Sequence, residues 1–233
     1  MASLDGASNI EAAWSETRKV SQDLGAAYIG IKQDFQADDP LFLWTLPEWV
    51  TEMYLETVYP DHDPRLAHCR ANTTPYFYGR EFWLRDDVIP EPRRVYDEEI
   101  VGVGMKSMVA IPVHKATGSS FGLVAWAFDM SNAELQRHYS DAGSVIHLVA
   151  IAAYERIAAL VNGEQRARIG LSKRECESLL WLGRGLRYSQ IAEKLGVRSG
   201  TVEFHLGNAR RKLGAKSREQ ALVRAMQLDI INP

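Results

Sequence analysis

The sequence predicts an α+β protein, with an N-terminal α/β/α sandwich around an antiparallel sheet and a C-terminal all-α domain of four helices. Two strand-like runs, residues 108–114 and 121–128, are joined by a short turn, as in an antiparallel hairpin. Helical patterns lie on both sides of this pair, and from residue 171 onward the patterns are only helical. This order predicts two domains and a sheet covered by helices.

The N-terminal part alternates between helical and strand-like segments. Residues 8–24 carry apolar side chains at helical spacing, and residues 26–31 and 41–46 are short apolar runs of strand type. Pro47 marks the start of the next helix, because proline is favoured in the first turn. The remaining expected elements are a short helix within 66–69, an irregular aromatic segment at 73–93, a helix at 93–103 and a long helix at 133–161.

Capping sequences mark the helices of the C-terminal part. Ser172 with Glu175, and Ser217 with Gln220, have the spacing of capping boxes and open the first and fourth helices. Ser189 is the expected N-cap of the second helix. These caps predict four short helices around one small core.

The third of these helices is expected to begin at Ser199, after a tight turn at Gly196. One side is apolar at spacings of three and four, and the other is hydrogen-bonding and cationic, which suits a DNA major groove. We therefore predict a helix-turn-helix, with an ordinary helical bundle as the alternative. Thr201, Glu203 and Asn208 are candidates for base edges, and the basic side chains for phosphates. The expected DNA-binding residues are Arg198, Ser199, Thr201, Glu203, His205, Asn208, Arg210, Arg211 and Lys212.

The distribution of charge also separates the two parts. From residue 171 onward there are 12 Lys and Arg against 6 Asp and Glu, a balance of +6. Because the whole chain has a net charge of −3, residues 1–170 carry −9. A small basic domain beside a larger acidic one predicts binding to DNA through the basic part.

Other classes of protein have less support. Cys69 and Cys176 form no disulfide framework, and neither a signal peptide nor a run of about 18 apolar residues is seen, so we expect a cytoplasmic protein without a membrane segment. The Asp, His and Cys residues within 61–69 lack zinc-ligand spacing. No nucleophile elbow or phosphate-binding Gly loop is present. We expect no enzyme, no metal and no cofactor.

Several C-terminal motifs resemble those of the LuxR-type DNA-binding domain, also called NarL/FixJ-type. They are Leu171-Ser-x-Arg-Glu175, Ile191-Ala-x-x-Leu195, Thr201-Val-x-x-His205 and Lys212-Leu213. The order of the N-terminal elements resembles the autoinducer-binding domain that precedes this module in quorum-sensing regulators. The resemblance implies a ligand-binding and dimerisation domain at 1–161, a linker at 162–170 and a helix-turn-helix domain at 171–233.

The resemblance also implies a ligand site. In this family a Tyr, and an Asp nine residues later followed by Pro, hold an acyl-homoserine lactone, and Tyr54 with Asp63-Pro64 has this spacing. Asp63 is then expected to accept the ligand amide N–H, and Tyr54 to donate to the acyl carbonyl. Candidate ligand-binding residues are Tyr54, Asp63, Trp49, Val50, Tyr78, Trp83 and Ala125.

Some of these positions depart from the family pattern. Val50 stands where the family has a Trp that donates to the lactone, and Trp49 is one helical step away. Tyr78 replaces a second Trp unless an insertion brings Trp83 there, Ala125 replaces a Ser or Thr, and Met108 replaces a Gly. A different small ligand, or none, therefore stays open as an alternative.

The partners implied by the resemblance are double-stranded DNA, an acyl-homoserine lactone or similar small ligand, a second copy of the chain in a homodimer, and RNA polymerase. We expect the ligand to complete the N-terminal core and to stabilise a dimer through the long helix. A phosphorylated receiver domain is disfavoured as the alternative sensor, because the sequence lacks an alternating parallel βα pattern.

Overall fold

The computed structural model describes residues 6–33, 41–58, 63–79, 91–114 and 121–233. The chain divides into two compact units, residues 1–158 and residues 159–233, which are described separately below. The functional boundaries expected at residues 161 and 171 stay predictions.

A five-stranded sheet forms the centre of the first unit. Its strands lie in the order β2-β1-β5-β4-β3, and every neighbouring pair is antiparallel. This confirms the expected antiparallel sheet and the central hairpin. The strands are β1 (Tyr28–Gln33), β2 (Phe42–Trp44), β3 (Tyr76–Gly79), β4 (Ser107–His114) and β5 (Phe121–Phe128).

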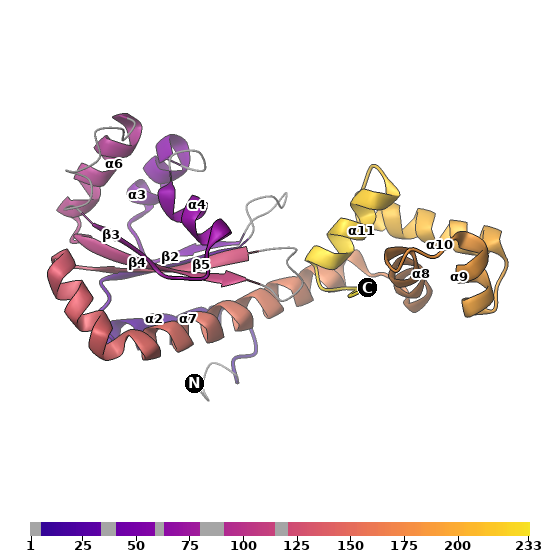
Figure 1. Cartoon of the computed structure of the whole chain (residues 1–233), viewed down its shortest axis with the longest axis horizontal. Coiled ribbons are helices and arrows are strands. Elements are labelled where there is room, and N and C mark those ends of the chain that lie inside the picture. The colour runs from indigo at the N-terminus through magenta and orange to yellow at the C-terminus, as the bar shows by residue number, and fades with distance from the viewer. Residues whose placement is uncertain (1–5, 34–40, 59–62, 80–90, 115–120) are drawn as a thin grey trace. The chain divides into compact units, whose positions relative to one another are not determined.

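Helices cover both faces of this sheet, which confirms the α/β/α sandwich (Figure 1). One face carries α3 (Glu48–Met53), α4 (Pro64–Ala71) and α6 (Glu91–Gly102), and the other carries α2 (Ile10–Asp23) and the beginning of α7 (Asn132–Ile169). Helix α3 continues into a π-helical turn, η1 (Tyr54–Val58).

The middle strand β5 is buried along its whole length because helices pack on both faces of the sheet. The core on the α3, α4 and α6 side includes Val50, Tyr54, Leu66, Cys69, Tyr78, Tyr96, Met108, Ala110 and Ala125, with Phe42 and Trp44 packed against it. This core contains Val50, Tyr54, Tyr78 and Ala125 of the expected ligand site.

Two expectations for the first part of the chain were wrong. Residues 76–79, expected to be irregular, form strand β3, because the backbone there pairs with β4 at the edge of the sheet. The long helix was expected to end before Asn162, with a linker at 162–170. Instead α7 continues to Ile169, because Asn162 and Gly163 both remain in helical conformation.

The second unit contains α8 (Lys173–Gly183), α9 (Tyr188–Leu195), α10 (Ser199–Lys212) and α11 (Arg218–Gln227) around one apolar core. The predicted stripe of α10 is buried in that core. The expected cap Ser189 was wrong: the N-cap of α9 is Arg187, two residues earlier, and Gln190 Oε1 accepts the backbone N–H of Arg187 at 2.9 Å. Gly196 ends α9 with φ of 65°, a left-handed conformation that suits glycine.

The capping boxes were only partly as expected. Ser172 and Glu175 form the full reciprocal pair at the start of α8. At the start of α11, Ser217 accepts from Gln220 N, but Gln220 Oε1 accepts from Lys216 N rather than from Ser217 N. The capping residues were therefore right, and the second box was shifted by one residue.

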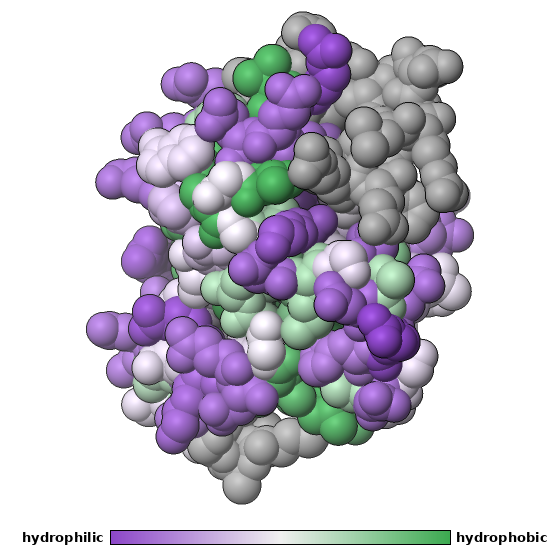
Figure 2. All heavy atoms as spheres, turned by 90° about the vertical axis from the view of Figure 1, so that its left-hand side faces the viewer, coloured by the Kyte–Doolittle hydropathy of each residue, from purple (hydrophilic) through white to green (hydrophobic). Residues whose placement is uncertain are grey.

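By length and composition alone, one helix in the described residues, α7, is apolar enough to cross a membrane, and 39% of its most apolar window is buried inside the structure. A helix packed along a sheet satisfies the same criterion. In the view of Figure 2, coloured hydrophilic side chains surround several groups of hydrophobic ones.

Candidate functional site

Tyr54 and Asp63, predicted from their spacing, are in contact in the folded chain. Tyr54 lies where α3 passes into η1, and Asp63 is the N-cap of α4, with Pro64 in the first helical turn. The Tyr54 hydroxyl donates to Asp63 Oδ2 at 2.6 Å, and both side chains are buried. The local capping geometry therefore places this carboxylate inside the core.

Arg65 makes the strongest contacts with this carboxylate, and the sequence analysis did not identify it. Its Nε donates to Asp63 Oδ1 at 2.7 Å and its Nη2 donates to Asp63 Oδ2 at 2.8 Å, a two-pronged pair. Burial alone would lower the pKa of Arg65, but the charge of Asp63 outweighs this and the pKa lies well above its ordinary value. The guanidinium is therefore a permanent buried cation.

Lys32 brings a second cation to the same place from strand β1. Its side chain is fully buried, its Nζ donates to the Tyr54 hydroxyl, and it lies 3.6 Å from Asp63 Oδ2. The ammonium also lies 3.8 Å from the ring centroid of Tyr54 and 5.0 Å from those of Phe42 and Trp44. Lys32, Tyr54, Asp63 and Arg65 form what we call the charged cluster.

The charged cluster changes what Asp63 can do for a ligand. Asp63 Oδ1 accepts from the backbone N and Nε of Arg65, and Oδ2 accepts from Tyr54 and from Arg65 Nη2. These four bonds fill the acceptor capacity of a carboxylate. A ligand amide N–H would therefore have to displace one of them. Burial, and then the charge of Asp63, raise the pKa of Tyr54 well above its ordinary value, so that its hydroxyl stays protonated.

The other predicted ligand-binding residues lie in different environments. Val50 and Ala125 are fully buried in the same core, whereas the Trp49 side chain is 45% exposed. Tyr78 is buried and donates to Asp97 on α6. Trp83 lies outside the described residues. No group of His, Cys, Asp or Glu in the described segments could hold a metal ion.

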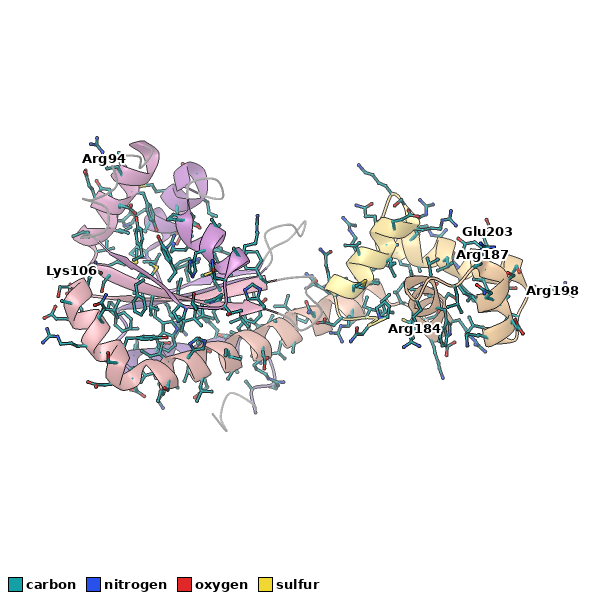
Figure 3. All side chains as sticks on the ribbon, in the orientation of Figure 1. Arg94, Lys106, Arg184, Arg187, Arg198 and Glu203 are labelled. Carbon is teal, nitrogen blue, oxygen red and sulfur yellow. The ribbon has the colours of Figure 1, made fainter. Side chains whose placement is uncertain are left out.

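The residues predicted to bind DNA lie mostly on the solvent side of the second unit. Arg198 is the N-cap of α10, and Arg198, Ser199 and Glu203 are exposed, whereas Thr201, His205 and Asn208 are half-buried. Figure 3 labels Arg187 at the start of α9, and Arg198 and Glu203 at the start of α10. The helix-turn-helix therefore presents its polar face to solvent.

Three of the predicted phosphate-binding residues already have partners within the unit. Lys212 Nζ donates to Glu175 Oε2 at 2.8 Å and to the carbonyl of Gly170 at 3.0 Å. Arg210 donates to the carbonyl of Lys216, and Arg211 donates to Asn208 Oδ1. Lys212 therefore ties α10 to the start of α8, and its role as a phosphate contact stays a prediction.

Phe204 is a candidate that the sequence analysis missed. It lies on α10 between two predicted DNA-binding residues, and 64% of its side chain is exposed. An apolar ring on the outer face of a recognition helix can contact the methyl group of thymine. The signal was present in the sequence, since Phe204 falls outside the stripe of buried apolar residues.

Two family models match the chain. Residues 9–157 match the family described as "Autoinducer binding domain", and residues 170–225 match "Bacterial regulatory proteins, luxR family". The first match alone covers more than half of the chain, and the two matches follow the same order as the two structural units.

Individual proteins give similar results. A candidate HTH-type transcriptional regulator of Sinorhizobium fredii, y4qH, is 28% identical over 187 residues, 79% of this chain but only 55% of that protein. RpaR of Rhodopseudomonas palustris, a quorum sensing-dependent transcriptional regulator, is 29% identical over 180 residues. The matched region covers 77% of this chain and 70% of RpaR. The crystal structure of Escherichia coli SdiA has a TM-score of 0.71 at 18% identity, covering 99% of this chain and 95% of SdiA, a similarity of fold.

Proposed function

Because the chain belongs to the LuxR family of quorum-sensing transcriptional regulators, we propose that its first unit senses a small signal molecule and its second unit binds promoter DNA. The ligand is an acyl-homoserine lactone or a related small molecule. The regulator acts in the cytoplasm, binds a two-fold symmetric site as a homodimer, and contacts RNA polymerase at the promoter.

The observation that best supports the sensor role is the buried pair of Tyr54 and Asp63. A phenol and a carboxylate 2.6 Å apart in an apolar core are an unusual arrangement for packing alone, because burying polar groups is costly. The pair lies in the segment that matches the autoinducer-binding family. A ligand that binds only the folded sensor stabilises it, by about 2.7 kcal/mol at one hundred times its Kd.

The DNA-binding role is supported by the exposed polar face of α10 and by the +6 balance of the segment from residue 171 onward. Release of counterions from DNA makes such binding strongly dependent on salt. The affinity for specific and nonspecific DNA should therefore fall together with rising salt, with the specific complex remaining tighter.

A binding assay tests the proposal directly. Fragments recovered from a random DNA library by the purified protein are titrated by fluorescence anisotropy, with and without acyl-homoserine lactones of different chain length. We expect an enriched two-fold symmetric sequence and a ligand-dependent change in its Kd. Enrichment without symmetry would contradict the homodimer, and absence of any enriched sequence would contradict the regulator role.

The second candidate is a regulator of this family that senses a different molecule or acts without one. It is favoured by the four hydrogen bonds that fill Asp63, since a lactone amide would have to break one. Mass spectrometry of the protein purified from its native host, with denaturation to release small molecules, distinguishes these cases. A co-purified lactone supports the first candidate, and a ligand-free protein that still binds its DNA sequence supports the second.

A further inference from the structure

Two buried cations, Lys32 and Arg65, contact the Tyr54–Asp63 pair. Lys32 and Arg65 supply only donors, Trp44 adds an indole N–H, and Asp63 is the carboxylate that they surround among the described residues. The family site for a neutral lactone, as implied by the resemblance, uses a Trp that this chain replaces with the apolar Val50. The chemistry at this position is therefore cationic rather than neutral.

Two of these donors lack a good acceptor in the described part of the chain. Arg65 Nη1 donates to the thioether of Met108 at 3.1 Å, and a thioether is a weak acceptor. Trp44 Nε1 is buried without a hydrogen-bond partner among the described residues. The Arg65 guanidinium carbon lies 5.5 Å and the Trp44 ring centroid 6.2 Å from the centroid of the Tyr54 ring. A buried donor without a good acceptor destabilises the folded protein, and a bound ligand that accepts from it would remove that cost.

We propose that the charged cluster and Trp44 bind the carboxylate of a small organic acid, whose apolar body packs against the neighbouring aromatic rings. This inference rests on the proposed sensor function and specifies its ligand class. A carboxylate offers only acceptors and a negative charge, which complements Lys32, Arg65 and Trp44. The rings of Phe42, Trp44, Tyr54 and Tyr96 lie 5.3 to 6.2 Å apart in adjacent pairs and supply the apolar wall.

The proposal predicts that a lactone binds less tightly than an acid. A lactone head group brings an amide N–H that needs an acceptor, and Asp63 is already filled. Opening the lactone ring by hydrolysis gives the same acyl chain with a free carboxylate, which offers only acceptors and a negative charge that complements Lys32 and Arg65. The two molecules therefore form a matched pair of probes.

The test measures how much each probe raises the melting temperature of the full-length protein. Acyl-homoserine lactones with acyl chains of 4 to 12 carbons are each compared with their own ring-opened acid. The acid 3-phenylpropanoate is compared with its neutral amide, 3-phenylpropanamide. We expect at least one acid to bind with a Kd at least ten-fold lower than its neutral partner. Tighter binding of the neutral partners, equal binding, or no shift with any acid at 10 mM overturns the proposal.

Three variants separate recognition from folding. Lys32→Met keeps the length of the side chain and removes its charge, and Trp44→Phe keeps a ring and removes the N–H. Each should reduce the preference for the acid, with a cooperative thermal unfolding transition of the variant as the check on folding. Lys106→Met, at an exposed ion pair with Asp129, is the matched control and should leave the preference unchanged. An acid preference that survives both Lys32→Met and Trp44→Phe overturns the assignment.

Selection from the DNA library tests the regulator role separately from the carboxylate site. If the wild-type protein enriches a DNA sequence but prefers neutral ligands, the regulator role stands and the carboxylate site is wrong. If it binds an acid but enriches no DNA sequence, the carboxylate site stands and the proposed regulatory output is wrong.

Discussion

Asp63 is the residue whose removal should most disturb the first unit. It is buried, accepts a two-pronged pair from Arg65, and lies 3.6 Å from Lys32 Nζ. Asp63→Asn would leave two buried cations without their carboxylate, and losing one partner of a buried ion pair costs about 3–5 kcal/mol. We expect urea unfolding of the first unit at a correspondingly lower midpoint.

An exposed ion pair provides the control for this prediction. Lys106 and Asp129 are 2.7 Å apart, with side chains 52% and 59% exposed. Pairs of this kind contribute at most about 1 kcal/mol, so Asp129→Asn should change the midpoint little. Equal losses from the two substitutions would mean that burial does not govern the contribution of Asp63.

The thiol of Cys69 should be unreactive in the folded protein. Burial, and then the charge of Asp63, raise its pKa to about 12. At pH 8 only about one molecule in ten thousand then carries the reactive thiolate. Alkylation of Cys69 by iodoacetamide, followed by peptide mass spectrometry, should require unfolding. The half-buried Cys176 is the internal comparison and should react first.

The raised pKa also sets the sign of a pH effect. Below about pH 9, the ordinary value of a thiol, Cys69 is neutral in both folded and unfolded chains and contributes no pH dependence. Above it, the unfolded chain ionises while the folded chain keeps its proton, so the free energy of unfolding falls as pH rises. Cys69→Ala should remove this part of the decline between pH 9 and 11.

At the residue scale, sequence spacing was enough to predict Tyr54 and Asp63 but not their cationic partners. Lys32 follows an apolar run, and a lysine at the end of a strand is usually solvated, so its burial was unexpected. Its partners lie more than twenty residues away in sequence, which no local pattern reveals. Arg65 stands two residues after Asp63, yet nothing local indicates that it folds back onto the carboxylate.

At the scale of elements, Glu175 of the α8 capping box also bonds to α10. Glu175 accepts from the backbone N of Ser172 at 2.6 Å and from Lys212 Nζ at 2.8 Å. Burial alone would raise the pKa of Glu175, but these hydrogen bonds outweigh it and the pKa lies below its ordinary value of 4.5. The stabilisation is therefore complete above about pH 4.5 and is lost as pH falls through the lowered pKa.

Hydrogen exchange of peptides from 171–213 should detect this loss. We expect protection to fall on acidification below pH 4.5, and Glu175→Gln to weaken protection at neutral pH and to flatten its pH dependence. Glu177→Gln is the matched control, because Glu177 pairs with Arg174 within the helix and not with α10. A flat profile for the wild type would show that Glu175 keeps an ordinary pKa.

Recognition by α10 should depend on Phe204. Its side chain is 64% exposed, so Phe204→Ala should change stability by less than about 0.5 kcal/mol. Its loss should weaken binding to the selected DNA sequence by about 1–3 kcal/mol, the usual cost of one lost base-pair contact. The slope of affinity against salt should stay the same, because no phosphate contact changes.

Val223→Ala on α11 is the control for Phe204, since Val223 is 51% exposed and lies on a different helix. It should leave both specific and nonspecific DNA binding unchanged. An equal loss with specific and nonspecific DNA for Phe204→Ala would contradict a role in reading bases.

Most elements could be predicted from local signals, and the failures have physical causes. Caps and periodicity located α8, α10 and α11, since these signals lie within a few residues. Strand β3 was missed because its aromatic residues do not alternate with polar ones and it forms only by pairing with β4. Asn162 and Gly163 were taken for a helix end, but α7 continues through them.

At the scale of the whole molecule, the division of charge separates two tasks. Residues 1–170 carry −9 and the remainder +6, so we expect nonspecific attraction to DNA to come mainly from the C-terminal part. Two recognition helices read a symmetric site only if two copies are held together, which raises the effective concentration of the second. We expect a surface that holds two copies together to be apolar enough to associate and yet to lie outside the core.

Helix α7 has a surface of this kind in the first unit. Val145 is 49% and Leu148 55% exposed, three residues apart on one face of the helix. A shallow groove beside them is lined by Tyr139, Gly143, His147 and Leu148. We expect this face to pair with its copy in the homodimer, in keeping with the two-fold symmetry of such interfaces.

Leu148→Glu should therefore convert the dimer to a monomer in sedimentation equilibrium, because an unpaired carboxylate would be buried at the interface. Binding to the full symmetric DNA site should weaken far more than binding to a half-site, since only the full site needs both copies. Val95→Glu is the matched control, with Val95 45% exposed on α6, and should leave the dimer intact. If Leu148→Glu stays dimeric while the wild type binds symmetric DNA, the pairing surface lies elsewhere on the chain.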